Sequence, residues 1–511
     1  MNGYYETPSG FASPANVNPG CAARPRALTC NRFAVGLIAA AEVCRFQRQF
    51  LKNRPSPDAA CPLPVIHSNG GPGYTTRMSE TRKPRRRRFQ YSLGSLMLLT
   101  LFVSFGMSWY AVQAKRAREQ KQAVRELRKL GGEIEYDYGV QETGIPARAG
   151  PPGPAWLRSL LGEDFFATVV SVRFYGPSVT DAALDHLKEL SQLRTLSLEF
   201  TNVTDEGLKH LTGMTHLQTL NLMGTPVRGS GLEYIKALTR LQELDLDGTH
   251  VTDAGLKHVK GLTQLRVLAL DETQITDAGL EQVKGLTELK SLSLVQTNVT
   301  DAGIERVKGL TKLKELHLYG THVADAGLEH IKGLTKLEAL SLGYTKVTDA
   351  GLEHIKGLTR LQSLGLDGTR VTDAGLENLK GMTQLHTLLL SSTNVTGAGL
   401  EHIGRLTTLQ ELRLDRTRVT DSGLEHVRGL IRLIVLDLTS TRVTDAGLER
   451  LKGMTQMLSL FVSGTNVTDA GLEHVRGLTG LNVLFVRGTK VTDQAVKRLQ
   501  QALPSCRIDG P

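Results

Sequence analysis

From Leu193 to Lys490 the chain is a tandem series of one 24-residue unit without an insertion. The unit that starts at Leu241 reads LQELDLDGTHVTDAGLKHVKGLTQ. A segment this short cannot bury its own apolar face, so it is stable only when neighbouring units stack on it. The repeat therefore predicts a solenoid with a long exposed surface. The equivalent first positions are Leu193, Leu217, Leu241, Leu265, Leu289, Leu313, Leu337, Leu361, Leu385, Leu409, Leu433, Met457 and Leu481.

Each unit contains the pattern of one strand followed by one short helix. Leu244 and Leu246 stand two residues apart and share the buried face of a strand, while Asp245 between them faces the other way. The segment G-L-K-H-V-K-G-L then places apolar residues three apart, which keeps them on one helical face. One strand and one helix per turn predict an α/β solenoid.

Two polar residues of the unit have expected structural roles. A threonine leaves the strand, Thr249 in this unit, and it recurs in all thirteen full repeats. Because buried backbone groups need partners, we expect each hydroxyl to bond the backbone of the neighbouring turn. Asp253 is a favourable N-cap for the helix.

The repeat extends imperfectly beyond both ends of the regular run. Residues 169–174 align with a strand one period before the run, although Pro177 replaces the threonine there, as is usual for an end repeat. Ile508 stands one full period after Leu484, and residues 494–511 are expected to cap the last turn. About fourteen parallel strands follow, spanning on the order of 60 Å at ~4.8 Å per strand.

The motifs resemble a known architecture. A period of this length with L-x-x-L-x-L is typical of leucine-rich repeats. The sequence T-x-V-T-D-A-G-L, as in Thr345 to Leu352, resembles bacterial leucine-rich repeats of the same length. The N-terminal part of the chain resembles membrane-anchored leucine-rich-repeat proteins of planctomycete bacteria. The resemblance lies in the order of its features, which are a basic run, an apolar segment, L-R-K-L-G-G at Leu127 to Gly132 and W-L-R-S-L-L-G-E-D-F-F at Trp156 to Phe166. This resemblance covers Met78 to the end.

The resemblance implies a fold but little about function. The implied fold is a leucine-rich-repeat solenoid, or horseshoe, of about 14 repeats. Its parallel sheet lies on the concave face and its short helices on the convex face, and one transmembrane helix precedes it.

Leu93 to Val112 is a continuous run without a charge. It has the length of roughly 20 residues that a transmembrane helix needs to cross a bilayer core of ~30 Å. Trp109 and Tyr110 stand near one end, where interfacial aromatic residues belong. A cleavable signal peptide and a buried helix are the alternatives, but the run is long for the former. The dense basic cluster from Arg82 to Arg88 favours a cytoplasmic N-terminus, with the repeats on the non-cytoplasmic side.

The remaining segments complete the expected organisation. The charged stretch before Gly131 is interpreted as a solvated stalk that continues the anchor helix, and a short dimer seam is the alternative. We therefore expect the fragment from Glu163 to contain the whole core. In chain order the segments are a disordered extension at 1–77, a basic cytoplasmic segment at 78–92, a transmembrane helix at 93–112, a charged juxtamembrane helix at 113–130, a linker and N-terminal cap at 131–164, and the leucine-rich-repeat domain at 165–511. If translation begins at Met78, the extension at 1–77 lies upstream of the true start.

The charge is unevenly distributed along the chain. Residues 1–130 carry 21 Lys and Arg against 6 Asp and Glu, whereas the rest carries 40 against 45. The overall charge of +10 therefore comes from the N-terminal part, and the repeats are mildly acidic. A mildly acidic surface argues against a nucleic-acid partner for the repeats.

The sequence contains no motif for catalysis or for a cofactor. The patterns G-x-x-x-x-G-K-[ST], H-E-x-x-H and G-x-S-x-G are all missing from it. His330 and His354 occupy equivalent places in adjacent turns, as do His402 and His426, and such pairs could share a metal ion. An exposed position copied with the G-L-E-H motif is the favoured explanation. We expect no catalytic residue, cofactor or metal.

The third, fifth and seventh positions of each repeat should form the concave face. Glu243, Asp245, Asp247 and Asp271 make this face acidic around the fourth and fifth strands, counted from the strand at 169–174. Such a cluster could attract a basic partner or a cation, although a solvated polar face is the more common explanation.

Near the C-terminal end the same face turns apolar. Val435, Phe461, Val483 and Phe485 occupy its third and fifth positions. Exposed apolar patches tend to mark interfaces, where buried aromatic side chains act as anchors. The alternative is that the C-terminal cap folds over these residues, and the sequence does not choose between the two.

Together these features predict a non-enzymatic, membrane-anchored protein–protein interaction module of a bacterial cell envelope, with a protein ligand on the concave face. The identity of that ligand and the oligomeric state are not specified by the sequence. A substrate receptor of a ubiquitin-ligase-like system is one alternative, but no F-box-like helical segment is visible. An enzyme is the other, and the chain has no room for a catalytic domain outside the repeats.

Overall fold

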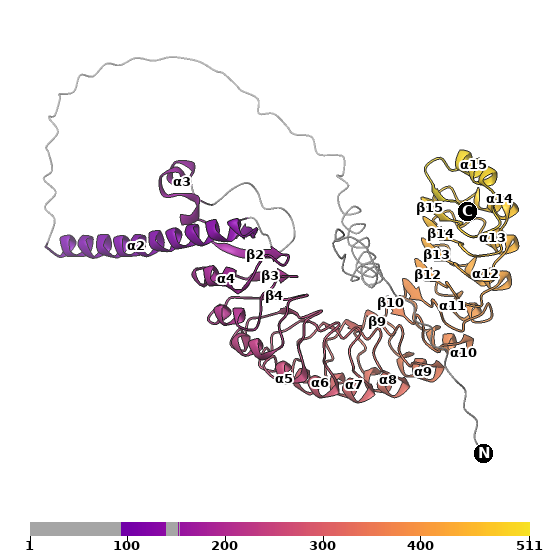
Figure 1. Cartoon of the computed structure of the whole chain (residues 1–511), viewed down its shortest axis with the longest axis horizontal. Coiled ribbons are helices and arrows are strands. Elements are labelled where there is room, and N and C mark those ends of the chain that lie inside the picture. The colour runs from indigo at the N-terminus through magenta and orange to yellow at the C-terminus, as the bar shows by residue number, and fades with distance from the viewer. Residues whose placement is uncertain (1–92, 139–151, 153, 511) are drawn as a thin grey trace, which may run out of the picture. The chain divides into compact units, whose positions relative to one another are not determined.

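The computed structural model describes residues 93–138, 152 and 154–510. They form one compact unit of stacked repeats (Figure 1). The segments predicted at 1–77 and 78–92 lie outside the described residues, as do residues 139–151 and 153 of the predicted linker and N-terminal cap.

All the strands of the described residues belong to one sheet of 16 strands in sequence order. The first pairs antiparallel with the second, and every later pair is parallel with a register of one repeat, as in Leu364 opposite Leu388. The strands are β1 (Glu133–Tyr136), β2 (Val169–Tyr175), β3 (Thr195–Glu199), β4 (Thr219–Asn221), β5 (Glu243–Asp245), β6 (Val267–Ala269), β7 (Ser291–Ser293), β8 (Glu315–His317), β9 (Ala339–Ser341), β10 (Ser363–Gly365), β11 (Thr387–Leu389), β12 (Glu411–Arg413), β13 (Val435–Asp437), β14 (Ser459–Phe461), β15 (Val483–Phe485) and β16 (Arg507–Asp509).

The fold class predicted from the repeat is confirmed, with two additional strands. Within the segment expected to cap the last turn, β16 is a parallel strand beside β15, and the antiparallel β1 was not expected. Ile508, one period after Leu484, was the periodic signal for β16, whereas β1 lies outside the repeated pattern and had no such signal.

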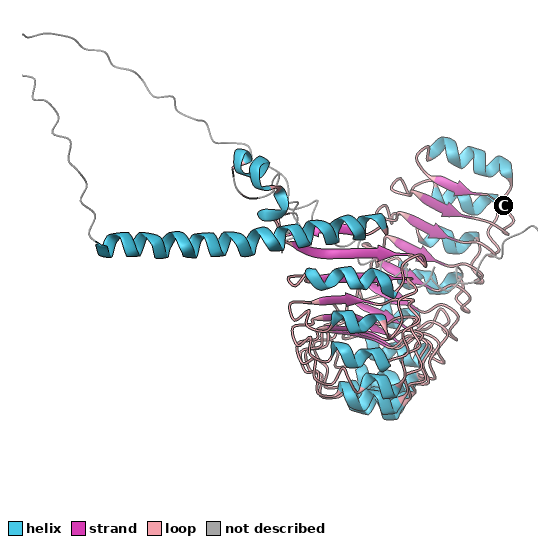
Figure 2. Cartoon of the chain, turned by 60° about the vertical axis from the view of Figure 1, so that its left-hand side comes forward, coloured by secondary structure: helices cyan, strands magenta, loops and turns pink. Residues whose placement is uncertain are grey.

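The helices of the repeats lie on one side of the sheet, so the strands line the inner side of the curve and these helices its outer side (Figures 1 and 2). They are short because each repeat allots only one or two turns to them. The helices, α or 3₁₀ (η), are α2 (Leu93–Lys129), α3 (Ala155–Leu161), η2 (Glu163–Phe165), α4 (Asp181–Leu184), η3 (Asp185–Glu189), η4 (Gly207–Leu211), η5 (Ser230–Ile235), α5 (Asp253–Leu256), α6 (Asp277–Val283), α7 (Asp301–Val307), α8 (Asp325–Ile331), α9 (Asp349–Ile355), α10 (Asp373–Leu376), η6 (Glu377–Leu379), α11 (Leu400–Ile403), α12 (Asp421–Val427), α13 (Asp445–Arg450), α14 (Asp469–Val475) and α15 (Asp493–Ala502).

The apolar columns form one continuous core between the sheet and the helices. Leu244 and Leu246 are fully buried, as are their equivalents along the stack. The glycine of each T-D-A-G-L motif allows the close stacking of adjacent helices. A Cβ atom on Gly279 would lie 2.4 Å from Oδ1 of Asp253 in the preceding turn, so a larger residue does not fit there.

The polar ladder between turns is built by aspartate, not by the strand threonine. Oγ1 of Thr249 donates to the carbonyl of Leu246 at 2.6 Å, within its own repeat. Asp253 instead accepts from the backbone N of Thr276 at 2.8 Å and from its hydroxyl at 2.6 Å, one repeat further on. The expectation of a threonine ladder was therefore wrong. Asp253 is also the first helical residue rather than the N-cap, which is Thr252.

The second half of α2 caps the N-terminal end of the core. Ala123, Val124 and Leu127 are buried within it, so the expectation of a solvated stalk was wrong. The core accordingly begins at Ala123, well ahead of Glu163, which corrects the expected boundary of the folded fragment. The stretch looked solvated because half of residues 113–130 are charged, and only one narrow face of the helix meets the repeats.

The glycines after α2 turn the chain back to form β1. Gly131 has a left-handed φ of 83°, which a glycine adopts without steric cost. The backbone N of Gly132 donates to the carbonyl of Leu127 at 2.9 Å. A Cβ atom on Gly132 would also lie 2.9 Å from the ring of Phe174, so the pair Gly131–Gly132 permits both the turn and the close packing.

Candidate functional site on the concave face

The predicted acidic residues come together on β5 and the turns that follow β5 and β6. Glu243 is exposed, whereas Asp245, Asp247 and Asp271 are half-buried. Oδ1 of Asp245 accepts from the backbone N of Asp247 at 3.0 Å, and Oδ1 of Asp247 accepts from that of Asp271 at 2.7 Å. Oδ1 of Asp271 in turn accepts from the backbone N of Val295 at 2.8 Å. Asp247 and Asp271 therefore each bind a backbone N–H of the next turn, whereas Asp245 binds one within its own turn.

The electrostatics of this cluster favour protonation. Burial, together with repulsion from Asp271 and Asp245, raises the pKa of Asp247 to about 8. Burial also raises the pKa of Asp271 to about 6, and the pKa of Asp245 is raised by burial and by Glu199. The cluster thus carries less negative charge near neutral pH than its composition suggests, because the ionised forms lose hydration and repel one another.

A second carboxylate of this kind lies further along the face. Oδ1 of Asp367 accepts from the backbone N of Ser391 at 3.0 Å, and burial raises its pKa to about 6. The hydroxyl of Ser391 donates to Asp415 one turn later. Sequence reasoning missed this site, although Asp367 and Asp415 occupy the same seventh position as Asp247 and Asp271.

The predicted apolar residues lie on β13, β14 and β15. The rings of Phe461 and Phe485 stack with their centroids 4.9 Å apart and their planes at 11°. Both rings are half-buried, as are Val435 and Val483. We call these four residues the apolar patch. The buried residues that alternate with the rings, such as Leu460, fill the core instead, so the rings contribute to the concave surface.

The C-terminal cap leaves the apolar patch on the concave side. α15 lies with the other helices behind the sheet (Figure 1). β16 continues the sheet, which places Asp509 beside Phe485 in the parallel register. The cap therefore lengthens the concave face beyond Phe485.

Two further aromatic pairs stand where the strands end, and sequence reasoning missed them. Tyr175 contacts Phe200 at 5.6 Å between ring centroids, and Tyr319 contacts Tyr344 at 5.2 Å. Phe200 and Tyr344 both have a φ of 55°, which is uncommon for bulky residues. The sequence signal for such a pair was an aromatic residue at the seventh position of one repeat followed by another at the eighth position of the next repeat.

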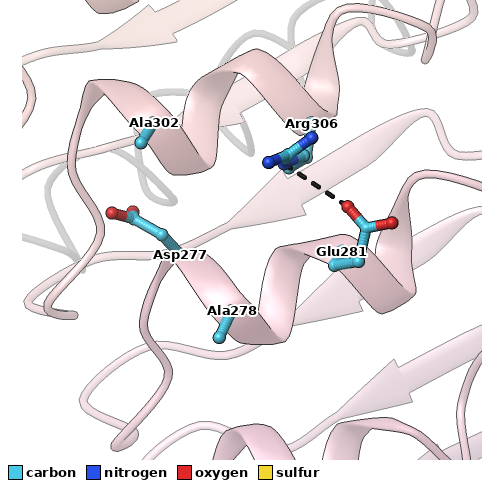
Figure 3. A pocket seen from close by; sticks show the side chains of 5 residues that line it. All are labelled: Asp277, Ala278, Glu281, Ala302 and Arg306. Carbon is cyan, nitrogen blue, oxygen red and sulfur yellow. Dashed lines mark ion pairs between the residues drawn. The ribbon is translucent and has the colours of Figure 1, made fainter.

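A shallow hollow on the convex face lies between α6 and α7 (Figure 3). Arg306 pairs there with Glu281 at 3.4 Å, and Asp277 accepts two hydrogen bonds from Thr300. These polar groups are therefore already used to hold adjacent turns together. The four histidines considered as metal ligands lie in α8, α9, α11 and α12 on the same face. Among the residues that the structure describes, no group of three or more His, Cys, Asp or Glu is arranged to hold a metal ion.

Comparisons with known proteins agree with this geometry. A sequence profile described as a leucine-rich repeat region matches residues 169–329, and one described as a leucine-rich repeat matches residues 333–355. A solved leucine-rich-repeat protein of Leptospira interrogans is 19% identical, with 65% of this chain and 88% of that chain covered and a TM-score of 0.50. No curated protein sequence matches the chain. The profiles and the solenoid together show the leucine-rich-repeat fold.

Two other solved structures have a similar arrangement. An internalin from Listeria monocytogenes is 25% identical, with 60% of this chain and 89% of that chain covered and a TM-score of 0.49. The ectodomain of the Arabidopsis receptor kinase HAESA, in complex with a peptide hormone ligand, is 16% identical, with 77% and 76% covered and a TM-score of 0.47.

Proposed function

We propose that this leucine-rich-repeat protein is a membrane-anchored binding module of a bacterial cell envelope, which recognises a protein ligand on its concave face. The stacked pair Phe461 and Phe485 carries the binding part of the proposal. Stacked aromatic rings that face away from the core supply apolar area at a low cost in side-chain entropy, as the anchors of protein interfaces do.

The chemistry of the concave face supports a protein ligand rather than a reaction. The apolar patch offers rings and methyl groups without a nucleophile or a general base among them. The acidic cluster of Glu243, Asp245, Asp247 and Asp271 supplies a polar region elsewhere on the same sheet. An apolar anchor and a separate polar region are features of a surface that selects a partner.

Substitution of both phenylalanines tests the site. In a fragment from Gln113 onward, Phe461→Ala with Phe485→Ala should weaken ligand binding at least about tenfold, or ~1.4 kcal/mol, and leave melting nearly unchanged. The ligand is first isolated from envelope extracts with the wild-type fragment, and its affinity is then measured by calorimetry. Val462→Ala is the matched control, because this neighbouring side chain is fully buried and its loss should lower melting instead.

Other outcomes would change the assignment. A fall in melting for the double variant would place the two rings in the C-terminal core and contradict the proposed site. If neither binding nor melting changes, the interface lies elsewhere, and Asp247→Asn becomes the next variant to examine.

The membrane part of the proposal rests on the first half of α2. Among the described residues, α2 is the one helix long and apolar enough to cross a bilayer, with a mean hydropathy of 1.6 over its best 18 residues. None of that window is buried, and Phe102 is 83% exposed, which disfavours the interpretation as a core helix. An exposed apolar helix of this length fits the hydrocarbon core of a bilayer.

Carbonate extraction and N-terminal sequencing test the anchor. The protein should stay with the membrane pellet, and its mature chain should retain Leu93 to Val112. Release into the soluble fraction, or a mature start beyond Val112, would contradict an uncleaved anchor. We also propose that the N-terminus is cytoplasmic and the repeats non-cytoplasmic, which protease protection of the repeats in right-side-out and inverted vesicles would decide.

A further inference from the structure

The short helix α3 carries large apolar side chains that no other part of the described chain covers. Trp156 is 67% exposed and Leu160 is 73% exposed, and no residue of α3 is buried. The two residues are four apart, so they lie on the same face of the helix. A tryptophan and a leucine left together on a surface indicate a binding face.

Ring contacts tie the segment after α3 to the end of the apolar run in α2. Phe165 in η2 contacts Trp109 with ring centroids 6.3 Å apart and Tyr110 with centroids 5.7 Å apart. Phe166 packs against Phe165 at 5.1 Å. η2 therefore lies at the level where the uncharged stretch of α2 ends, and only Gly162 separates it from α3.

Basic residues follow the aromatic ones along α2. Lys115 and Arg118 are exposed, and Arg116 is partly exposed. Lys115 lies 3.7 Å from Glu119, a long and exposed pairing that compensates little of the charge. An apolar run, then aromatic rings, then charged residues is the order found where a helix leaves the hydrocarbon core of a bilayer.

We propose that α3 and η2 form a second membrane contact, in which Trp156 and Leu160 insert at the boundary between headgroups and acyl chains. This inference rests on the proposed anchor at residues 93–112. It commits to the lipid leaflet as the occupant of the exposed face, because α3 is joined through Gly162 to η2, whose Phe165 contacts the interfacial end of the anchor. Amphipathic segments of this kind lie in the plane of the interface.

The second contact would fix how the solenoid sits on the membrane. A single helix can rotate about its axis, whereas a second point of insertion prevents that rotation. Gln120, the first buried residue of the cap, follows Trp109 by about three helical turns, or ~16 Å along the axis. The first repeats would thus be held close to the lipid surface in one orientation.

The chain contains only two tryptophans, which makes the test direct. Trp109→Phe leaves Trp156 as the sole emitter, and Trp156→Phe leaves Trp109. The full chain of each variant is reconstituted into vesicles of phosphatidylcholine and phosphatidylglycerol, with bromine placed either near the headgroups or near the chain ends. Trp156 emission should fall at least about twofold with the shallow label, and less with the deep label.

Matched variants separate insertion from a change in folding. In the Trp109→Phe background, Leu160→Ser should reduce the quenching of Trp156, whereas Ser159→Ala, in the same helix, should not. Circular dichroism of each reconstituted variant should be unchanged, because α3 contributes no buried residue to the core.

The two proposals fail in different ways. If Trp109 is not quenched in the Trp156→Phe variant, the anchor itself is wrong. If Trp109 is quenched but Trp156 is not and remains accessible to acrylamide, only the second contact is overturned. Protection of Trp156 from acrylamide without quenching by brominated lipid would also overturn it, since the face would then be covered by protein.

Discussion

The two ends of the solenoid are closed by different means. At the N-terminal end, α2 and the antiparallel strand β1 cover the first repeat, and both come from outside the repeated pattern. At the C-terminal end, α15 and β16 continue the order of helix and strand of the repeats themselves. Each end must shield the apolar face of a terminal repeat, which has a neighbour on one side only. The comparison shows that this shielding does not require the repeat sequence.

Each cap also contains a glutamine that bonds the backbone. Nε2 of Gln120 donates to the carbonyl of Ala167 at 2.8 Å, and its Oε1 accepts from the backbone N of Val169 at 3.2 Å. Nε2 of Gln500 donates to the carbonyls of Leu503 and Cys506 at 3.0 and 2.8 Å. The start of a strand presents both a backbone N–H and a backbone carbonyl, whereas the end of a helix presents carbonyls. Gln120 therefore both donates and accepts a hydrogen bond, while Gln500 only donates.

Removal of the N-terminal cap should have the largest effect. We expect the fragment from Glu163 to be about 5 kcal/mol less stable than the fragment from Gln113, because it loses the burial of Val124 and Leu127 and the pairing of β1, with each large side chain worth roughly 1.5–3 kcal/mol. Urea unfolding followed by circular dichroism measures the difference. Equal midpoints would show that the cap is dispensable and would break the comparison between the ends.

A charge placed in the core should cost less at an end than in the middle. Leu316→Asp should destabilise the Gln113 fragment by more than about 4 kcal/mol, since Leu316 is fully buried with turns on both sides. Leu127→Asp and Leu499→Asp should cost less, because fraying of a cap can expose the charge to water. Thermal melting gives the order, and equal shifts for all three variants would contradict nearest-neighbour stacking.

The two glutamines should differ in a smaller but measurable way. Gln120→Ala should destabilise the Gln113 fragment by about 1–3 kcal/mol, because it leaves a buried carbonyl and a buried N–H without their partner. Gln500→Ala should cost less, since Gln500 is only half-buried and water can replace its bonds. Chemical unfolding of both variants checks this, and a larger loss for Gln500→Ala would reverse the proposed difference between the caps.

Asp247 lies within the stack, away from both caps, so its effect on stability can be compared with the effects of the caps. In the folded protein the pKa of Asp247 is about 8, above its ordinary value of 3.8. Folding therefore favours the unionised acid, and the folded state loses stability as pH rises through this folded pKa. Asp247→Asn should therefore stabilise the fragment by about 1 kcal/mol near pH 9 and have little effect near pH 4. Melting across this range tests it, and a pH-independent difference would exclude titration of Asp247 as the cause.

The repeat was readable from sequence because each structural requirement recurs thirteen times. Leu244, Leu246 and their equivalents identified the strands, and the three-residue spacing of apolar residues identified the helices. The partners of the polar residues were less predictable. Whether Thr249 or Asp253 bonds the next turn depends on how far each side chain lies from it, and that distance is set by the stacking.

The site could be predicted only as a set of positions. The alternation along each strand placed Phe461 and Phe485 on the concave face, because side chains of a strand alternate between its two faces. The sequence could not show that the rings stack, that Asp247 and Asp271 accept bonds from backbone N–H groups, or that Tyr344 contacts Tyr319. Each of these depends on the separation and twist of neighbouring strands.

The sequence by itself determined the repeat length, the fold class and the residues that fill the core, since these follow from periodic burial of apolar side chains. Tertiary structure decided how the ends are closed. Val124 and Leu127 occur once, in a stretch whose charged residues dominate its pattern, and they become core residues only because the first repeat presents an apolar surface to that face of α2. A contact made once between distant segments leaves no period in the sequence, so only the folded chain reveals it.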